Sequence, residues 1–295
     1  MKNKQNIFLR CKDFTVSGEI FELEINEKLD MLITYPKPNK DDLANYYESE
    51  DYISHTDSKK SIMDKMYQIV KNYSIHQKIK LINSFDSGAR KILDIGCGTG
   101  DFLVACKTDG WSIFGVEPSA KARDLTFQKL IKKNSSVENT IEKDIEDILE
   151  YQDKTKQYDV ITMWHVLEHV PNLSEYIKIL KNLLKPNGVL IIAVPNFKSY
   201  DADYYKEYWA AYDVPRHLSH FSPKSIKILF EEIQMEVLNI LPMKFDAYYI
   251  SLLSEKYKSG ASNPLKAFYR GFISNLKARS TKQYSSLIYI IKNVR

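Results

Sequence analysis

The sequence predicts an α/β protein built on a mostly parallel β-sheet with helices on both faces, and three observations support this fold class. Apolar, strand-like segments alternate with amphipathic, helix-like segments between residues 91 and 241. The run VLIIAV at residues 189–194 is continuously apolar, which is typical of a strand buried on both faces. Another strand-like segment, residues 91–95, leads directly into a glycine-rich turn. Because parallel strands need a crossover connection, this alternation predicts parallel pairing with helices covering the sheet.

Two segments precede the expected sheet domain. Residues 1–38 hold short alternating stretches closed by Pro36 and Pro38, which predicts a small antiparallel β appendage. Residues 39–90 follow as an N-terminal helical segment or lid, because apolar residues recur at helical spacing over 41–52 and 59–85.

The sheet domain is expected in residues 91–295. Its seven strands are predicted at residues 91–95, 112–117, 137–142, 158–163, 189–194, 235–241 and 284–291. Its helices are predicted at residues 102–108, 120–132, 173–184 and 223–232. Two longer insertions, residues 196–221 and 245–280, interrupt the pattern, and we expect them to form caps over one end of the sheet.

Composition excludes several classes of protein. With 295 residues, 44% hydrophobic residues and a net charge of +4, the chain has a globular profile that excludes disorder and collagen-like structure. No apolar run of about 18 residues could span a bilayer, and residues 1–10 lack a signal-peptide core, so we expect a cytoplasmic protein. Cys11, Cys97 and Cys106 form no CxxC pair, which argues against disulfides and structural zinc.

Basic charge is concentrated in residues 256–295, which contain nine Lys or Arg residues and no Asp or Glu. A solvated basic face is one interpretation of this asymmetry. The other interpretations are a phosphate-bearing substrate, peripheral contact with an anionic membrane surface, and RNA. Nucleic acid is the least favoured partner because no RNA-binding motif occurs.

Three of the ten glycines lie within five residues, directly after the strand-like segment 91–95. Gly96, Gly98 and Gly100 would let a ligand approach the backbone and would present free amides at the start of a helix. The spacing is G-x-G-x-G, which fits neither the dinucleotide fingerprint G-x-G-x-x-G nor a phosphate-binding P-loop. The turn therefore predicts a nucleotide-type site, with NAD or FAD as the weaker interpretation.

Acidic residues end three successive predicted strands. Asp94 would repel a pyrophosphate but could hold the ammonium group of an amino-acid-like ligand. Glu117 could accept both hydroxyls of a ribose, and Asp144 could accept an adenine amino group. Alternatively, Asp94 and Glu117 act only as turn or cap residues, although their coincidence with the glycines favours a ligand site.

These features resemble the class I S-adenosylmethionine-dependent methyltransferases. The resemblance rests on LDIGCGTG at residues 93–100, EPS at 117–119, YDVI at 158–161 followed by VLEHV at 166–170, and KPNGVL at 185–190. Within that superfamily, the LEHV segment is similar to the bacterial group that includes the ubiquinone-biosynthesis O-methyltransferases. Residues 213–221, DVPRHLSHF, also resemble a block found in bacterial small-molecule and cell-envelope methyltransferases.

The resemblance implies a Rossmann-like seven-stranded sheet whose last strand is antiparallel, and S-adenosyl-L-methionine as the cofactor, with S-adenosyl-L-homocysteine as its product. It also implies an N-terminal appendage that has lost the zinc module carried by some relatives. The implied cofactor-binding residues are Asp94, Gly96, Cys97, Gly98, Gly100, Phe102, Glu117, Pro118, Asp144, Ile145, Trp164, His165 and Tyr52.

Methyl transfer from a sulfonium needs few catalytic groups, because the donor is already activated and the protein mainly positions the acceptor and removes its proton. Candidate bases lie after the fourth and fifth predicted strands: His165, His169, His217 and His220. Alternatively, His165 lines the cofactor's methionine end or packs in a turn, and Glu168 with His169 caps and packs a helix start. No third ligand completes a metal site around this Glu/His pair, so no metal is expected.

The insertion 196–221 is rich in aromatic residues, which suit a planar or lipophilic acceptor. The candidate substrate-binding residues are Tyr204, Tyr208, Trp209, Tyr212 and Arg216. A packed surface loop, organised by hydrogen bonds of Arg216, His217 and His220, is the alternative. In the second insertion, we expect Lys266, Arg270, Lys277 and Arg279 near an anionic acceptor or a membrane.

Together these observations predict an S-adenosylmethionine-dependent methyltransferase that acts on a small, aromatic or lipid-linked acceptor, with O-methylation slightly favoured. The alternatives are a non-catalytic cofactor-binding regulatory or partner subunit, a methyltransferase acting on RNA or protein, and an NAD-dependent enzyme. The sequence does not decide whether the chain forms a homodimer.

Overall fold

The structure is a computed structural model that describes residues 6–39, 42, 45–47, 62–85, 88, 90–133, 141–145, 148 and 158–294. Among the described residues, no helix is long and apolar enough to cross a membrane. The predicted helix at 41–52 and the first four residues of the predicted strand at 137–142 lie largely or wholly outside the described residues.

The described strands form a seven-stranded sheet in the order β10-β11-β8-β7-β4-β5-β6. Its strands are β4 (Lys91–Ile95), β5 (Ser112–Val116), β6 (Ile141–Glu142), β7 (Tyr158–Trp164), β8 (Leu184–Pro195), β10 (Met235–Pro242) and β11 (Ser286–Asn293). Neighbouring strands from β6 to β8 pair in parallel, whereas β11 pairs antiparallel with both β8 and β10. The predicted sheet, with its antiparallel last strand, is therefore confirmed; β11 begins and ends two residues later than expected.

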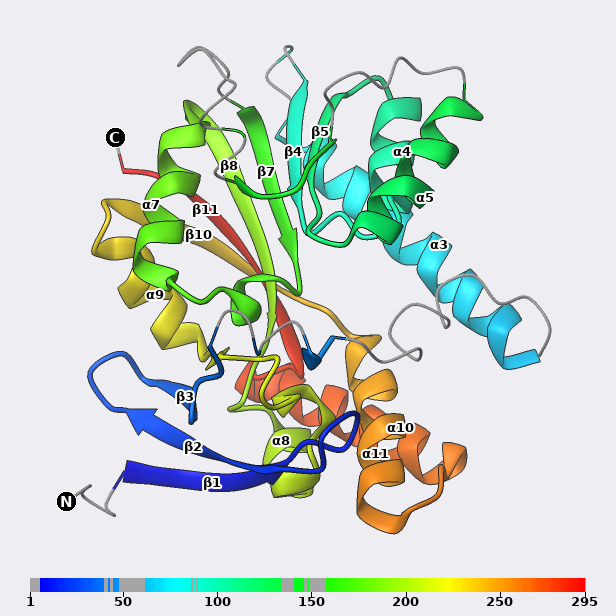
Figure 1. The fold of residues 1–295 in the computed structure, drawn as a ribbon, viewed down its shortest axis with the longest axis vertical. Helices are drawn as coiled ribbons and strands as arrows, with labels where there is room; N and C mark the ends of the chain where they lie inside the picture. The colour runs from blue at the N-terminus through cyan, green and yellow to red at the C-terminus, as the bar shows by residue number, and fades with distance from the viewer. Residues whose placement is uncertain are drawn as a thin grey trace.

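Helices cover both faces of this sheet (Figure 1). The helices α3 (Ile62–Asn83), α4 (Asp101–Thr108) and α5 (Ala120–Ile131) lie on one side. On the other side lie α7 (Leu173–Leu183) and α9 (Pro223–Glu231). All five agree with the predicted helices to within a few residues, and apolar residues of each pack into the clusters against the sheet.

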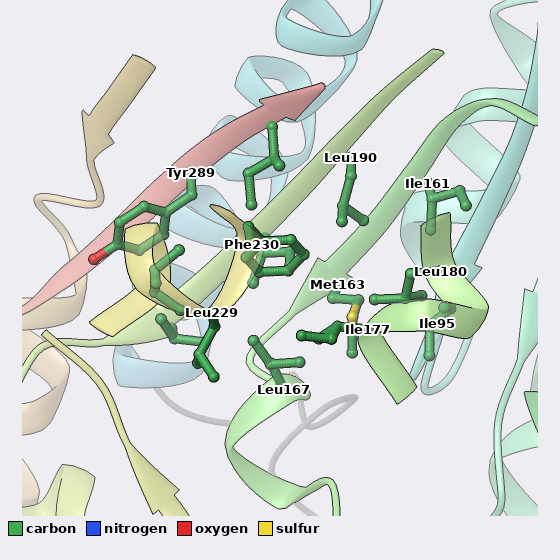
Figure 2. Packing of buried hydrophobic residues seen from close by; sticks show 14 of the residues in the cluster. Ile95, Ile161, Met163, Leu167, Ile177, Leu180, Leu190, Leu229, Phe230 and Tyr289 are labelled. Carbon is green, nitrogen blue, oxygen red and sulfur yellow. The ribbon is translucent and has the colours of Figure 1, made fainter. Parts of the chain in front are cut away.

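Two buried apolar clusters explain why the strand sequences are almost entirely apolar. Leu190 and Ile192 point into the cluster under α7 and α9, whereas Val189 and Ile191 point into the cluster under α3, α4 and α5. Successive residues of a strand face opposite sides, so a strand covered on both faces must be apolar at every position. Figure 2 shows the first cluster, in which Leu180 and Phe230 approach the sheet residues Ile161, Met163 and Leu190.

A second, four-stranded sheet lies beyond one end of the first. It has the order β1-β2-β3-β9 and consists of β1 (Ile7–Lys12), β2 (Ile20–Asn26), β3 (Met31–Tyr35) and β9 (Ser219–His220). The pairing of Leu32 with His220 and of Ile33 with Ser219 was not predicted. The N-terminal β segment and the insertion 196–221, which the sequence presented as separate units, thus share one sheet.

The two insertions lie beside this second sheet (Figure 1). The first contains α8 (Tyr200–Tyr205) and the short 3-10 turns η3 (Lys206–Tyr208) and η4 (Ala210–Tyr212), and the second contains α10 (Asp246–Ser259) and α11 (Pro264–Thr281). Buried hydrogen bonds join them: Tyr205 donates to Glu255 over 3.0 Å, and Ser274 donates to Asp201 over 2.6 Å. We call β1–β3, β9, α8, η3, η4, α10 and α11 together the cap lobe.

Candidate functional site

The glycine turn after β4 has the backbone conformation that its sequence predicts. Gly96, Gly98 and Gly100 have φ angles of 69°, 56° and 77°, a region that side chains other than glycine's rarely adopt. A Cβ atom would lie 2.4 Å from Val166 at Gly96 and 2.3 Å from Thr126 at Gly100, so packing alone requires glycine at both positions. At Gly98, a Cβ atom would meet nothing within 4 Å. The middle glycine therefore faces open space, where a ligand could approach the backbone.

The carboxylate of Glu117 is fixed beside this turn at the end of β5. Its Oε2 accepts a hydrogen bond from the Gly98 amide, and its Oε1 accepts one from the Ser119 amide, both over 2.9 Å. A carboxylate oxygen can accept more than one hydrogen bond, so both oxygens keep capacity for a ligand's donors. The glycine turn and the carboxylate thus form one rigid unit.

Asp94 and Lys78 place opposite charges behind the turn. Asp94 is buried at the end of β4, where its carboxylate accepts a hydrogen bond from the Thr162 hydroxyl over 2.6 Å. Burial raises the pKa of Asp94 to about 7, although the Thr162 hydrogen bond and the charge of Lys78 act in the opposite direction. Burial also lowers the pKa of Lys78, on α3, to about 8. Sequence reasoning missed Lys78, because the helical pattern gives no sign that this lysine turns inward.

Aromatic residues line the same region. The Lys78 ammonium lies 4.1 Å from the ring centre of Trp164, and Trp164 packs edge-on against Phe102. The indole N–H of Trp164 is buried without a hydrogen-bond partner among the described residues. Of the other predicted cofactor residues, Cys97 and Ile145 are buried and Asp144 and Pro118 are more exposed, while Tyr52 lies outside the described residues. Their roles stay predictions.

His165 follows β7 and lies between two carboxylates. Its φ of 58° is unusual for a residue other than glycine. Its Nε2 is 2.9 Å from Asp246, and its Nδ1 is 3.4 Å from Glu168. Burial would lower the pKa of His165, but the neighbouring carboxylate of Asp246 outweighs burial and raises the pKa to about 10. At neutral pH, this imidazole is therefore charged.

Asp246 was not predicted as a site residue, although a signal existed. It begins α10, four residues after β10 ends. Because β10 and β8 run in the same direction, the carboxyl end of β10 lies at the sheet edge where the other site residues gather. An acidic residue a few positions after a predicted strand could have been included on this basis.

Of the other three candidate bases, His217 and His220 are buried and His169 is partly buried. Burial and the nearby His217 lower the pKa of His169 to about 4 and that of His220 to about 3. Nδ1 of His217 contacts the Ala211 carbonyl over 2.9 Å, and Nε2 of His220 contacts the Thr34 hydroxyl over 3.0 Å. Glu168 and His169 lie in the 3-10 turn η2 (Leu167–His169) instead of at the start of an α-helix. A role as base stays a prediction for each of them.

The structure places the five predicted substrate residues in two different environments. Arg216, at 3% exposure, donates to Asp213 and Asp13, while Trp209, at 2%, donates to Asp201. Tyr212 is buried in the same apolar cluster as Trp209. The contacts of these three side chains are internal, and their role toward an acceptor stays a prediction. Tyr204 and Tyr208 are only partly buried, and their role toward an acceptor stays a prediction.

The basic residues of α11 also have partners inside the molecule. Arg270 lies 4.0 Å from the ring centre of Tyr204, and Lys277 lies 3.9 Å from that of Tyr200. Lys266 pairs with the buried carboxylate of Glu255 over 2.8 Å. These contacts hold α11 against α8 and α10, so part of the basic charge has a structural role.

The fold and the site define the class of protein. A parallel sheet, a positive-φ glycine turn after one strand and a carboxylate at the end of the next are the arrangement of a nucleotide-type ligand site in an α/β protein. Within that class, the chain belongs to the methyltransferase-domain family, whose model matches residues 49–240.

Curated relatives and solved structures agree with this family. The chain is 29% identical over 158 residues to a ubiquinone biosynthesis O-methyltransferase of Rickettsia typhi, covering 54% of this chain and 61% of the relative. A ubiquinone biosynthesis O-methyltransferase of Rickettsia bellii is 30% identical over 156 residues, which cover 52% of this chain and 62% of the relative. The chain thus matches about three fifths of the length of these relatives.

Among solved structures, magnesium protoporphyrin IX methyltransferase from Synechocystis PCC 6803 with bound SAH has a TM-score of 0.56 at 15% identity. The similarity covers 86% of this chain and 100% of that one. A sarcosine dimethylglycine methyltransferase from Galdieria sulphuraria, described as putative, has a TM-score of 0.53 at 14% identity, over 86% of this chain and 99% of that one. At these identities, the comparison establishes a shared fold.

Proposed function

We propose that this chain transfers a methyl group from S-adenosylmethionine to an oxygen of a small, aromatic or lipid-linked acceptor. The observation that carries the proposal is the position of the Glu117 carboxylate. It accepts a hydrogen bond from the Gly98 amide, next to the open space at this middle glycine of the turn. A carboxylate in this position suits the two hydroxyls of a ribose, whereas the carboxylate of Asp94 would repel a pyrophosphate, which disfavours dinucleotides. Membership of the methyltransferase-domain family supports the same assignment.

The residues around the turn fit both ends of this cofactor. Asp94, once ionised, would attract its ammonium and sulfonium charges, and Lys78 would attract its carboxylate. The indole N–H of Trp164, which has no partner among the described residues, is a buried hydrogen-bond donor in the same region. The ring of Phe102 packs against Trp164 and adds an apolar surface there. Once bound, the cofactor supplies an activated methyl group, and the protein supplies orientation, exclusion of water and removal of the acceptor's proton.

An oxygen acceptor is favoured because charged and polar groups gather after β7. His165, held in its charged form by Asp246, would stabilise negative charge that develops on an acceptor hydroxyl. The named activity of the curated relatives, O-methylation in ubiquinone biosynthesis, supports oxygen and a lipid-linked ring for this chain.

A lipid-linked acceptor is further supported by α11. Five apolar side chains recur at helical spacing along it, yet all are exposed: Leu265 at 86%, Phe268 at 63%, Tyr269 at 55%, Phe272 at 46% and Leu276 at 45%. An exposed aromatic and aliphatic helix face in a segment of net positive charge fits the surface of an anionic bilayer. We infer that α11 rests on such a surface while the cap lobe receives the acceptor.

Calorimetry and turnover together test the proposed reaction. S-adenosylmethionine and S-adenosylhomocysteine should bind the full chain, and Glu117→Ala should weaken binding about tenfold or more. Glu236→Ala, which changes an exposed glutamate on β10, is the matched control and should bind normally. Transfer of labelled methyl to phenols, improved by an alkyl tail, is the expected turnover. Binding without transfer to phenols, lipid extract, RNA or protein would instead favour a non-catalytic cofactor-binding subunit.

Sedimentation with vesicles tests the membrane contact separately. The chain should sediment with vesicles of phosphatidylcholine and phosphatidylglycerol, less with phosphatidylcholine alone, and Phe268→Ser with Phe272→Ser should release it. Ile20→Ser, which changes an equally exposed residue on β2, is the matched control. Equal sedimentation of the two variants would refute the assignment of α11 as the contact.

A further inference from the structure

Three side chains with metal-ligating atoms converge beside His165. Glu168, His169 and His217 each offer one such atom, and these atoms all lie within 4.8 Å of one another. Nε2 of His217 is 4.0 Å from Oε1 of Glu168. Sequence reasoning found the Glu168 and His169 pair but no third ligand. The fold supplies it, because the backbone N–H of Leu218 bonds to the Glu168 carbonyl and holds the segment with His217 against η2.

The carboxylate of Glu168 is buried without a hydrogen bond among the described residues, although His165 forms an ion pair with it. The residue is 1% exposed, and neither of its oxygens has a hydrogen-bond partner among the described residues. Its nearest cationic neighbour, His165, is 3.4 Å away and lies closer to Asp246. Burying a carboxylate without hydrogen bonds costs several kcal/mol, so such groups are usually paired or coordinate a metal.

Both histidines are fixed in the tautomer that ligates through Nε2. Nδ1 of His169 lies 3.0 Å from the Arg216 carbonyl and 2.9 Å from the Tyr47 hydroxyl, and Nδ1 of His217 lies 2.9 Å from the Ala211 carbonyl. Because a carbonyl oxygen only accepts, each Nδ1 carries the proton and each Nε2 keeps its lone pair. A backbone carbonyl behind the second ring nitrogen is the usual support of a metal-bound histidine.

Neighbouring groups that could compete for this role are already engaged. Asp213 lies 4.0 Å from Nε2 of His217, but both its oxygens accept hydrogen bonds from Arg216. His220 contacts Thr34, and His165 pairs with Asp246. The ligand atoms of Glu168, His169 and His217 are therefore less engaged than those of these neighbouring groups.

We propose that Glu168, His169 and His217 bind one divalent transition-metal ion. Two imidazoles and one carboxylate suit such ions, and three protein ligands leave coordination positions open. With metal to ligand distances of about 2.0–2.2 Å, ligand atoms around one ion lie roughly 3–4 Å apart, so only a small contraction of the cluster is needed. If the proposed methyl transfer holds, an open position would take the acceptor oxygen and help to remove its proton.

Metal binding can be tested without turnover. Co²⁺, whose visible spectrum reports its ligands, is titrated into the metal-free full chain, and Zn²⁺ is titrated by calorimetry. One ion should bind per chain, and Glu168→Gln, His169→Ala and His217→Ala should each weaken binding by about tenfold or more. The matched control, His76→Ala, changes an exposed histidine on α3 and should bind as the wild type does.

Circular dichroism and melting temperature confirm that each variant is folded before its affinity is compared. If Glu168→Gln does not fold, the two histidine variants carry the test. Absence of Co²⁺ and Zn²⁺ binding by the wild type would overturn the proposal, as would undiminished binding by folded His169→Ala and His217→Ala. Because S-adenosylhomocysteine binding is measured separately on the same samples, failure of the metal site and failure of the methyltransferase assignment are distinguishable.

Discussion

Replacing Gly98 by alanine would separate ligand binding from folding at the glycine turn. The φ of Gly98 is 56°, and a Cβ atom there would meet no protein atom within 4 Å. The Gly98 amide also donates to Glu117, the residue proposed to hold the ribose. The added methyl group would therefore occupy space that the cofactor needs, while it leaves the packing of the protein unchanged.

The expected cost in folding is small. A residue other than glycine in this conformation costs about 1–2 kcal/mol. Alanine also reduces the conformational entropy of the unfolded chain, which stabilises the folded state by about 0.4–1 kcal/mol. The net loss of folding stability is therefore about 1 kcal/mol. For a chain of this size, that corresponds to roughly 2 °C in melting temperature.

Gly260 provides a matched control. It ends α10 with a φ of 76°, and a Cβ atom there would also meet nothing within 4 Å. Gly260→Ala should therefore lose about the same stability as Gly98→Ala, but it lies outside the proposed cofactor site.

Calorimetry with S-adenosylhomocysteine, together with thermal melting of both variants, is the assay. We expect Gly98→Ala to bind at least about tenfold more weakly, or about 1.4 kcal/mol, and Gly260→Ala to bind as the wild type does. Equal affinities of the two folded variants would refute the interpretation that the open space at Gly98 is a ligand site.

Two further predictions concern pH. Because burial raises the pKa of Asp94 to about 7, above about 3.9 in the unfolded chain, stability should fall as pH rises between those values. The melting temperature of Asp94→Asn without cofactor should show less of this fall; equal profiles would contradict it. For Asp13, burial acts to raise the pKa, but hydrogen bonds from Arg216, Ser17 and Thr15 outweigh it and hold the pKa well below its usual range. Its stabilisation is therefore complete above about pH 4 and is lost as pH falls further, so Asp13→Asn should cost about 1.5–3 kcal/mol at neutral pH and less in acid, measured by urea unfolding.

The seven-stranded sheet could be predicted because the sequence pattern of each strand and helix lies within a short segment of the chain. Each strand is a short apolar run bounded by turn residues, and the helices between them carry one apolar stripe. The glycine turn is equally local, since strand, glycines and helix follow one another between Lys91 and Thr108. Glu117 could be assigned because parallel strands end at one edge, which fixes where β5 delivers its last residues.

The cap lobe could not be predicted because its contacts join distant segments. Strand β9 has only two residues, too few to show a period, and its partner β3 lies almost 190 residues earlier. The buried pair of Asp13 and Arg216 and the contact of His165 with Asp246 also join segments far apart in the chain. Tyrosines that look like a ligand-binding surface in sequence, such as Tyr212, are core residues once this lobe is assembled.

Two buried polar residues join the parts of the cap lobe. Asp201 accepts hydrogen bonds from Trp209, Ser274 and Ser285, which tie α8 to the residue between η3 and η4, to α11 and to the residue before β11. Arg216 donates to Asp13 and Asp213 and so joins the second sheet to the loop that carries His217. Buried charges with all partners present fix one arrangement, because removal of any partner leaves an uncompensated group.

The family model ends at residue 240 and begins at residue 49, so β1–β3, α10, α11 and β11 all lie outside the matched part. The glycine turn, Glu117 and the cluster of Glu168, His169 and His217 lie within it. Asp246, which sets the charge of His165, lies outside. The glycine turn and Glu117 therefore lie in the part of the chain that the family model matches, whereas Asp246 and the cap-lobe elements β1–β3, α10 and α11 lie outside that part. If the proposed function holds, substitutions in the cap lobe should change acceptor choice, and substitutions in the glycine turn between β4 and α4 should change cofactor affinity.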